Sequence, residues 1–313
     1  MFLDPVLAHA VLKAWAMTAP RQILSGTTYL VTRRCLQRCF LLRPSPLTND
    51  TVGYLLAVAA ARYGILVHAF CVLSNHLHLV VTDPEARLPA FSQYFDSLVA
   101  RAINRSLGRW ETFWAPSSYS AVALTTPEDI VAKTAYVLAN PVAAGLVPEA
   151  RRWPGLWSGP AAIAGDPLKF KRPDGFFRKK GKLPEVAELQ LVAPPGFASA
   201  EAFRSQLESE LATLEARARE EVAASGMQFV GEARIMKVAP WSRPTNREVR
   251  RGLNPRIACG DKWKRIEALG RLKAFVDAYR HALQRWRRGM SAVFPAGTYL
   301  VRVTHDVPCA ATG

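Results

Sequence analysis

Residues 65–82 read Ile-Leu-Val-His-Ala-Phe-Cys-Val-Leu-Ser-Asn-His-Leu-His-Leu-Val-Val-Thr. The stretch is rich in apolar residues and is interrupted by Ser74-Asn75, so it predicts two strands, Ile65–Val72 and His76–Thr82, with a tight turn between them. Strands this close along the chain pair as an antiparallel hairpin. Because side chains alternate between the two faces of a strand, His76 and His78 are expected on the same face.

The segments on either side of this hairpin alternate between strand and helix patterns. We predict strands over Thr27–Arg33 and Tyr119–Leu124, and helices over Thr48–Tyr63, Pro89–Leu107 and Thr126–Asn140, the last stopped by Pro141. The resulting order, β-α-β-β-α-β plus a helix, is the split-βαβ or ferredoxin-like layout. We therefore expect an α+β fold, with a four-stranded antiparallel sheet and helices on one face.

The rest of the chain is predicted as three further parts. Residues 1–20 resemble a short helical extension, and the strands and helices above lie in a domain over 21–165. Residues 166–198 are rich in Lys and Arg and are expected to form an exposed, flexible linker. A mainly helical, basic region follows over 199–313, with a helix at Ser199–Ala224 and one or two short strands within Val293–Val303.

Charge and cysteine content narrow the class of protein. The 313 residues include 41 Lys and Arg against 25 Asp and Glu, a net charge of +16, which favours polyanionic partners, nucleic acid above all. Five cysteines without a paired CxxC spacing indicate reduced thiols rather than a zinc site or a disulfide framework. The N-terminus lacks the charge order of a signal peptide, and no apolar run approaches the roughly 18 residues that span a bilayer. We expect a cytoplasmic protein with no membrane contact.

Four residues are candidates for a catalytic site with a bound metal ion. His76 and His78 supply two imidazoles on one strand face, which is half of a divalent metal site. Tyr136 and Asn140 are four residues apart and therefore lie on one helix face. An amide oxygen suits Mg²⁺ or Mn²⁺ beside the imidazoles, and a tyrosine oxygen can attack phosphorus to form a covalent ester.

This pattern resembles the REP-associated tyrosine transposases, members of the single-tyrosine HUH transposases. Their signature is similar to Asn75-His76-Leu77-His78 on a strand and to Tyr136-Val137-Leu138-Ala139-Asn140-Pro141-Val142 on a helix, followed by Gly145. Further similarities are Tyr29–Arg33, Phe113-Trp114, Pro148-Glu149 and Trp153-Pro154. The resemblance covers residues 21 to 165, and the chain departs from it at Ser74, where Pro is usual, and at Leu30, where His is frequent.

The resemblance implies specific roles. His76, His78 and Asn140 would hold Mg²⁺ or Mn²⁺ over a phosphate, and Tyr136 would cleave single-stranded or hairpin DNA, leaving a 5′-phosphotyrosine and a free 3′-hydroxyl. Palindromic repeats would be the substrates, and the reverse reaction would rejoin strands. Relatives act as monomers or as dimers that place the tyrosine in trans, so a homodimer is left open.

Basic residues are the candidates for phosphate contact. We expect DNA contacts, nucleoid association and steep salt dependence from these cations: Arg33, Arg34, Lys169, Lys171, Arg172, Lys179 and Lys180. Two alternatives remain open. The chain could be a domesticated protein that binds repeat DNA or RNA without cleaving it, or a metallonuclease that uses water and keeps Tyr136 for packing.

Overall fold

The computed structural model describes residues 20–116, 119–178, 181–245 and 255–311. The predicted extension, except Pro20, lies outside the described residues, as do Lys179 and Lys180. The chain divides into two compact units, one over Ser25–Gly260 and the other formed by Asp261–Gly313 with the residues up to Leu24. The predicted parts, 1–20, 21–165, 166–198 and 199–313, stay a prediction.

A five-stranded sheet lies at the centre of the larger unit. Its order is β2-β3-β1-β4-β7, with bounds β1 Thr27–Arg34, β2 Leu66–Leu73, β3 His76–Asp83, β4 Ser120–Leu124 and β7 Ile257–Ala258. The predicted α+β class and the four predicted strands are confirmed. The prediction of a purely antiparallel sheet of four strands is wrong, because a fifth strand, β7, pairs parallel with β4 and makes the sheet mixed. A strand of two residues carries no hydrophobic period from which it could be predicted.

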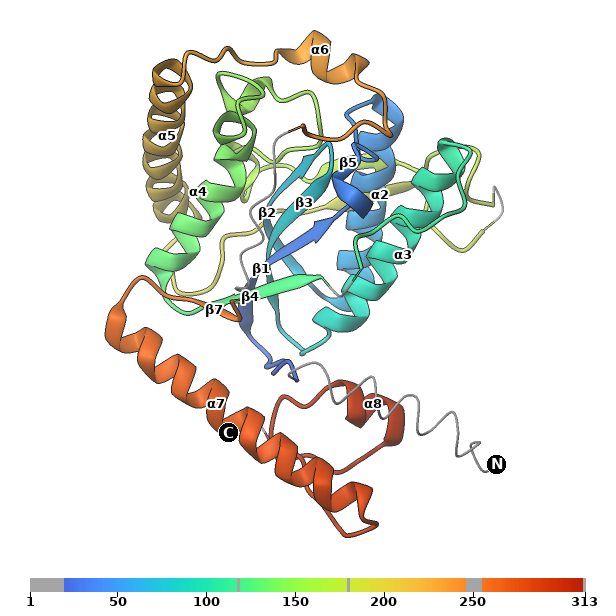
Figure 1. Ribbon diagram of the computed structural model, residues 1–313, viewed down its shortest axis with the longest axis vertical. Helices are drawn as coiled ribbons and strands as arrows, with labels where there is room; N and C mark the ends of the chain where they lie inside the picture. The colour runs from blue at the N-terminus through green and yellow to red at the C-terminus, as the bar shows by residue number, and fades with distance from the viewer. Residues whose placement is uncertain (1–19, 117–118, 179–180, 246–254, 312–313) are drawn as a thin grey trace. The chain divides into compact units, whose positions relative to one another are not determined.

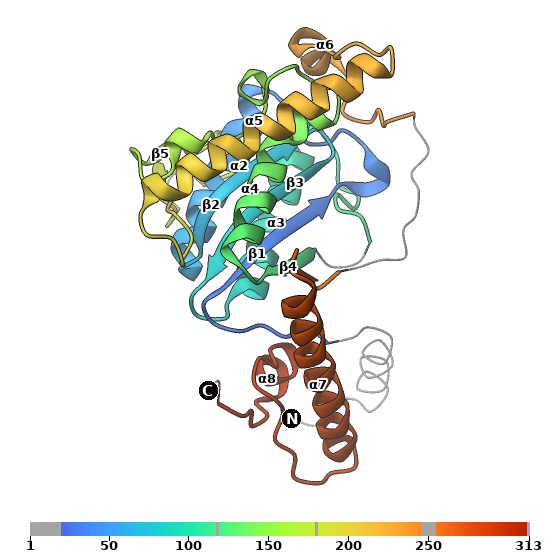
Figure 2. The same ribbon diagram turned by 90° about the vertical axis from the view of Figure 1, so that its left-hand side faces the viewer.

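Helices cover both faces of this sheet. Helices α2 (Pro46–Tyr63) and α3 (Leu88–Ser106) lie on one face, and α4 (Pro127–Ala143) and α5 (Ala200–Ala224) lie on the other (Figure 1; Figure 2). The prediction of helices on one face is therefore wrong. Seven of the eight residues of β2 and of β3 are buried, with no alternation, which is the pattern of strands covered on both sides.

Side-chain caps set where the helices begin. Ser45 accepts a hydrogen bond from the Thr48 N–H and starts α2, and Thr126 accepts one from the Asp129 N–H and starts α4. Contrary to the prediction, Pro141 does not stop α4, which continues to Ala143. A proline removes a helix hydrogen bond and disturbs the carbonyls of the preceding turn. In that turn the Trp157 indole N–H donates to the Leu138 carbonyl at 3.1 Å.

The predicted basic linker contains ordered structure. Strands β5 (Leu168–Lys171) and β6 (Val186–Leu189) form an antiparallel hairpin that packs against α2. The Tyr54 hydroxyl of α2 donates to the Pro184 carbonyl at 2.5 Å. Exposed and covered positions alternate along both strands, and the covered side chains are the apolar Leu168, Phe170, Ala187 and Leu189.

The predicted helix at Ser199–Ala224 is confirmed as α5, with Ser199 as its N-cap. Its buried residues include Phe203, Leu207 and Leu211, and it packs along α4 within the larger unit. Short elements complete this unit: α6 (Glu232–Lys237) and three 3-10 turns at Leu36–Arg38, Ala150–Arg152 and Pro160–Ala162.

The smaller unit is helical. It contains α7 (Lys262–Arg287) and α8 (Leu300–His305), whose side chains pack around Phe294. The predicted strands within Val293–Val303 are wrong: Phe294 makes a single bridge with Cys309, and residues 300–305 form α8. A turn separates Phe294 from α8: the Thr298 N–H donates to the Pro295 carbonyl. This turn interrupts the alternation of apolar residues. Within the described part of the chain, no helix has the length and apolar character needed to cross a membrane.

Candidate active site

The two histidines lie at the start of β3, between β2 and β1, on the face that α4 covers. Their ring centroids are 4.7 Å apart and their planes are perpendicular. His76 Nδ1 lies 2.6 Å from Asn75 Oδ1, and His78 Nδ1 lies 2.8 Å from the Thr32 hydroxyl on β1. Because the Asn75 oxygen can only accept, Nδ1 of His76 carries the proton and its Nε2 keeps a free electron pair.

Burial keeps both imidazoles neutral. It lowers the pKa of His76 to about 4, and the charge of Arg34 adds to this effect. Burial also holds the pKa of His78 well below its usual value, with a smaller contribution from His76. His78 Nε2 is buried and has no hydrogen-bond partner among the described residues. A neutral imidazole with an unpartnered nitrogen is the state that a metal ion requires.

Helix α4 brings Tyr136 to this pair within the same chain. The ring centroids of Tyr136 and His78 are 5.8 Å apart at an angle of 74°, and Tyr136 is 45% exposed. Asn140 is buried one helical turn further along. Lys133 lies one turn before, with its Nζ 5.8 Å from the centroid of the Tyr136 ring. One helix face therefore carries an ammonium, a phenol and an amide, and the phenol ring lies beside the neutral imidazole of His78.

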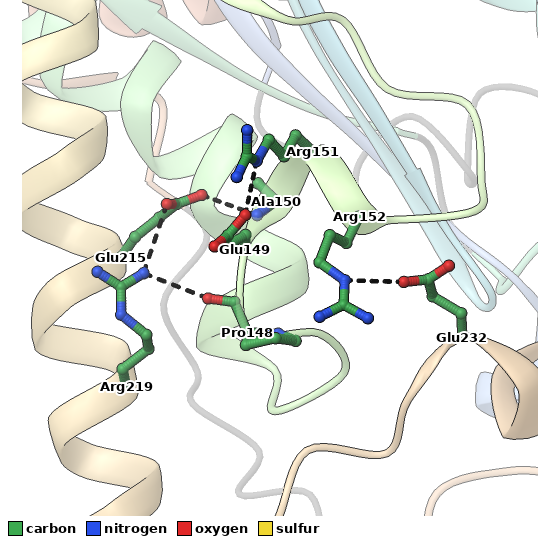
Figure 3. Close-up of polar contacts among 8 residues, drawn as sticks. All are labelled: Pro148, Glu149, Ala150, Arg151, Arg152, Glu215, Arg219 and Glu232. Carbon is green, nitrogen blue, oxygen red and sulfur yellow. Dashed lines mark hydrogen bonds and ion pairs between the residues drawn. The ribbon is translucent and has the colours of Figure 1, made fainter.

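The segment that follows α4 is tied to α5 and α6 (Figure 3). The Ala150 N–H donates to the Glu215 carboxylate at 2.8 Å, and Arg219 Nη1 donates to the Pro148 carbonyl at 3.2 Å. Arg152 pairs with Glu232 of α6 at 2.9 Å. These contacts, together with the buried side chains of α5, hold the helix that carries Tyr136.

Arg33 and Arg34, two of the predicted DNA contacts, differ from each other in their surroundings. Arg33 is turned to the opposite face of β1, where its Nε lies 3.3 Å from the Asp96 carboxylate and its guanidinium 5.4 Å from the Trp114 ring centroid. Burial raises the pKa of Asp96 to about 7 despite the arginine charge. Arg33 thus joins β1 to α3, which leaves it little surface for a phosphate. Arg34 is exposed, and its charge acts on His76.

The other described residues among the predicted DNA contacts, Lys169, Lys171 and Arg172, lie on or directly after β5. Lys169 pairs with Glu188 at 3.2 Å, Lys171 is exposed, and Arg172 Nη1 donates to the Leu183 carbonyl at 2.7 Å.

Three neighbours of the site were not among the predicted residues. Lys133 was detectable from its position three residues before Tyr136, which places it on the same helix face. Asn75 directly precedes His76 and belongs to the quoted motif. Thr32 could not be found without the register of β1 against β3, because only that register places it opposite His78.

Comparisons with known proteins find matching chains among the solved structures. No family model and no curated protein matches the chain. One similar structure is a REP-associated tyrosine transposase bound to a REP hairpin, with 19% identity and a TM-score of 0.37 over 43% of this chain and 78% of that one. Another is a Deinococcus radiodurans protein described as a transposase, with 18% identity and a TM-score of 0.28 over 36% of this chain and 89% of that one.

Proposed function

We propose that this chain is a transposase-type enzyme that cleaves and rejoins single-stranded or hairpin DNA through a 5′-phosphotyrosine. The observation that carries the proposal is the approach of Tyr136 to His78, 5.8 Å between ring centroids, within one chain. The net charge of +16 supports a polyanionic substrate. The REP hairpin in the similar transposase structure is consistent with hairpin DNA as that substrate.

The donor set fits Mg²⁺ or Mn²⁺. The Nε2 atoms of His76 and His78 and the amide oxygen of Asn140 would hold the ion, and the unpartnered His78 Nε2 is the atom that favours this reading. When bound, the ion supplies positive charge that polarises a phosphate oxygen. Asn75 and Thr32 would orient the two rings through their Nδ1 atoms, as partners of metal-bound histidines do.

Tyr136 would supply the nucleophile. Its partial exposure lets a phosphodiester reach the phenolic oxygen. The new bond joins that oxygen to phosphorus, and the bond from phosphorus to the 3′ oxygen breaks. The phenol proton is lost to solvent, and the departing 3′ oxygen takes up a proton. The resulting ester keeps the bond energy needed for rejoining a strand.

Adduct formation on hairpin DNA with Mn²⁺ tests this proposal. We expect wild-type protein to become covalently attached to the strand, and Tyr136→Phe to form no adduct while still binding the hairpin. His76→Ala with His78→Ala should abolish the adduct and also weaken Mn²⁺ binding in titration calorimetry by about 10- to 100-fold or more. Adducts formed by Tyr136→Phe would contradict the nucleophile, and unchanged Mn²⁺ binding would contradict the metal site.

The same experiment separates the two alternatives. Tight, salt-sensitive binding without any adduct would indicate a domesticated nucleic-acid-binding protein. Cleavage that leaves product ends free of protein would indicate a metallonuclease that uses water.

A further inference from the structure

A second surface of the larger unit has the chemistry of a nucleic-acid contact. Trp110 is 88% exposed, in the loop that joins α3 to β4. The loop itself is held in place. The Asn104 side chain donates to the Glu111 carbonyl at 2.7 Å, and the Arg109 N–H donates to the Asn104 carbonyl at 2.7 Å. The indole ring is therefore presented to solvent from a fixed backbone.

Backbone hydrogen bonds place this loop at the sheet end that carries the histidines. The Leu36 N–H donates to the Phe113 carbonyl, and the Ala115 N–H donates to the Arg34 carbonyl, each at 2.8 Å. Cys35 in turn donates to the Asn75 carbonyl at 2.8 Å. The loop that bears Trp110 and the start of β3 are thus joined through the end of β1.

Cations from two distant segments gather beside this loop. Arg105 Nε donates to the Gly175 carbonyl at 3.0 Å, and the Arg101 guanidinium lies 5.8 Å from the Phe176 ring centroid. These contacts bring the connection between β5 and β6 to the C-terminal end of α3 (Figure 1). The exposed cations of the two segments are Arg101, Arg105, Lys171, Arg178 and Lys182.

Few acids oppose these cations. Among the described residues of 101–111 and 171–182, the acids are Glu111 and Asp174, and Glu111 lies 3.6 Å from Arg109. An apolar protein partner would have to cover the cations around Trp110 without neutralising them. A nucleic-acid strand neutralises them with phosphates and offers unpaired bases to the indole ring.

We propose that Trp110 and five exposed cations form a docking surface for single-stranded DNA; the cations are Arg101, Arg105, Lys171, Arg178 and Lys182. An unpaired base stacks on Trp110, and the cations contact the phosphates around it. One part of this proposal rests on the proposed function: the docked segment is the DNA that flanks the strand held at Tyr136. Its binding chemistry does not depend on cleavage.

Binding of a labelled, unstructured oligothymidine tests the stacking, with every protein in the Tyr136→Phe background. Trp110→Ala should weaken binding by about 5- to 150-fold, the range for one stacked base, and Trp110→Phe should keep most of the affinity. Trp241→Ala is the matched control, because Trp241 is 70% exposed in the same unit but lies outside this surface. Equal affinity of the Trp110→Ala and Trp241→Ala proteins would overturn the proposal.

Salt and duplex measurements test the other features of the surface. Arg101→Ser with Arg105→Ser should reduce the salt slope of binding by up to about 1.4, whereas Arg217→Ser on exposed α5 should leave it unchanged. Thermal melts check that the variants fold. Trp110→Ala should leave binding of a blunt duplex unchanged, and an equal loss on duplex would contradict base stacking.

The two proposals fail in different ways. If oligothymidine binding depends on Trp110 but wild-type protein forms no adduct, the proposed function fails and the docking surface stands. If wild-type protein forms adducts and Trp110→Ala binds as tightly as the control, only the docking surface fails.

Discussion

His68 and His78 are buried on neighbouring strands, yet their ring nitrogens have different surroundings. His68 Nδ1 donates to the Val192 carbonyl at 2.8 Å, and its Nε2 lies 2.7 Å from the Thr82 hydroxyl. His78 Nδ1 is engaged with Thr32, but its Nε2 has no partner among the described residues. Buried polar atoms normally find partners, so the histidine with an unpartnered nitrogen is the candidate ligand and His68 is structural.

His68 predicts a specific pH dependence of stability. Burial lowers its folded pKa to about 4 from an ordinary value of 6.5. The unfolded chain therefore binds the proton first, and stability that is complete above 6.5 is lost as the pH falls toward 4. Urea unfolding with a chelator present should show a smaller loss between about pH 7 and about pH 5 for His68→Gln than for wild type. An equal loss in both proteins would contradict a neutral, buried His68.

Lys133 predicts a dependence of the chemistry on a positive charge beside Tyr136. Its ammonium lies over the Tyr136 ring, so it is placed to meet a phosphate that the phenol attacks. Lys133→Met should slow adduct formation by about 10- to 100-fold, while Lys133→Arg should recover part of the rate. Lys237→Met, which changes an exposed lysine on α6, is the control. A Lys133→Met protein as fast as this control would exclude the role.

Among the helices, α5 supports the position of α4. Leu207 is fully buried in the core, so Leu207→Ala should lower the free energy of unfolding by about 2–5 kcal/mol. Glu208→Ala, at an exposed position on the same helix, should change it by less than about 0.5 kcal/mol. Denaturant unfolding measures both variants. A Leu207→Ala protein as stable as the Glu208→Ala control would show that α5 is not part of the core.

The elements that the sequence predicts best are those with a clear period. The faces shared by His76 and His78, and by Tyr136 and Asn140, follow from periods of 2 and 3.6 residues. The contact between Tyr136 and His78 depends on how α4 packs against β2 and β3, which no local sequence pattern encodes. The family resemblance supplied that step.

Three other features differ from the predictions for separate reasons. Arg33 is the same residue type as Arg34 and its immediate neighbour, but strand alternation turns it toward Asp96. Pro141 predicts a helix stop because proline usually breaks the helix hydrogen bonding, yet α4 continues to Ala143. The unbroken apolar runs of β2 and β3 do indicate helices on both faces, because a strand with one exposed face alternates apolar and polar residues.

The residues of the candidate site lie in one unit, whereas the positive charge is spread over both units. All four residues of the candidate site lie in the unit over Ser25–Gly260. Residues 261–313 carry ten Lys and Arg against four Asp and Glu, a net charge of +6, and none of the site residues. The positive charge of this segment is therefore separate in sequence from the residues of the candidate site.

Mapping the attachment point of DNA on the whole protein tests the central claim most directly. Trypsin cleaves after Lys133 and Arg151, and residues 134–151 contain a single tyrosine, Tyr136. After reaction with hairpin DNA and Mn²⁺, mass spectrometry should find the 5′-phosphate of the cleaved strand on Tyr136 of this peptide. Attachment to another residue, or cleaved DNA with no protein attached, would contradict the account.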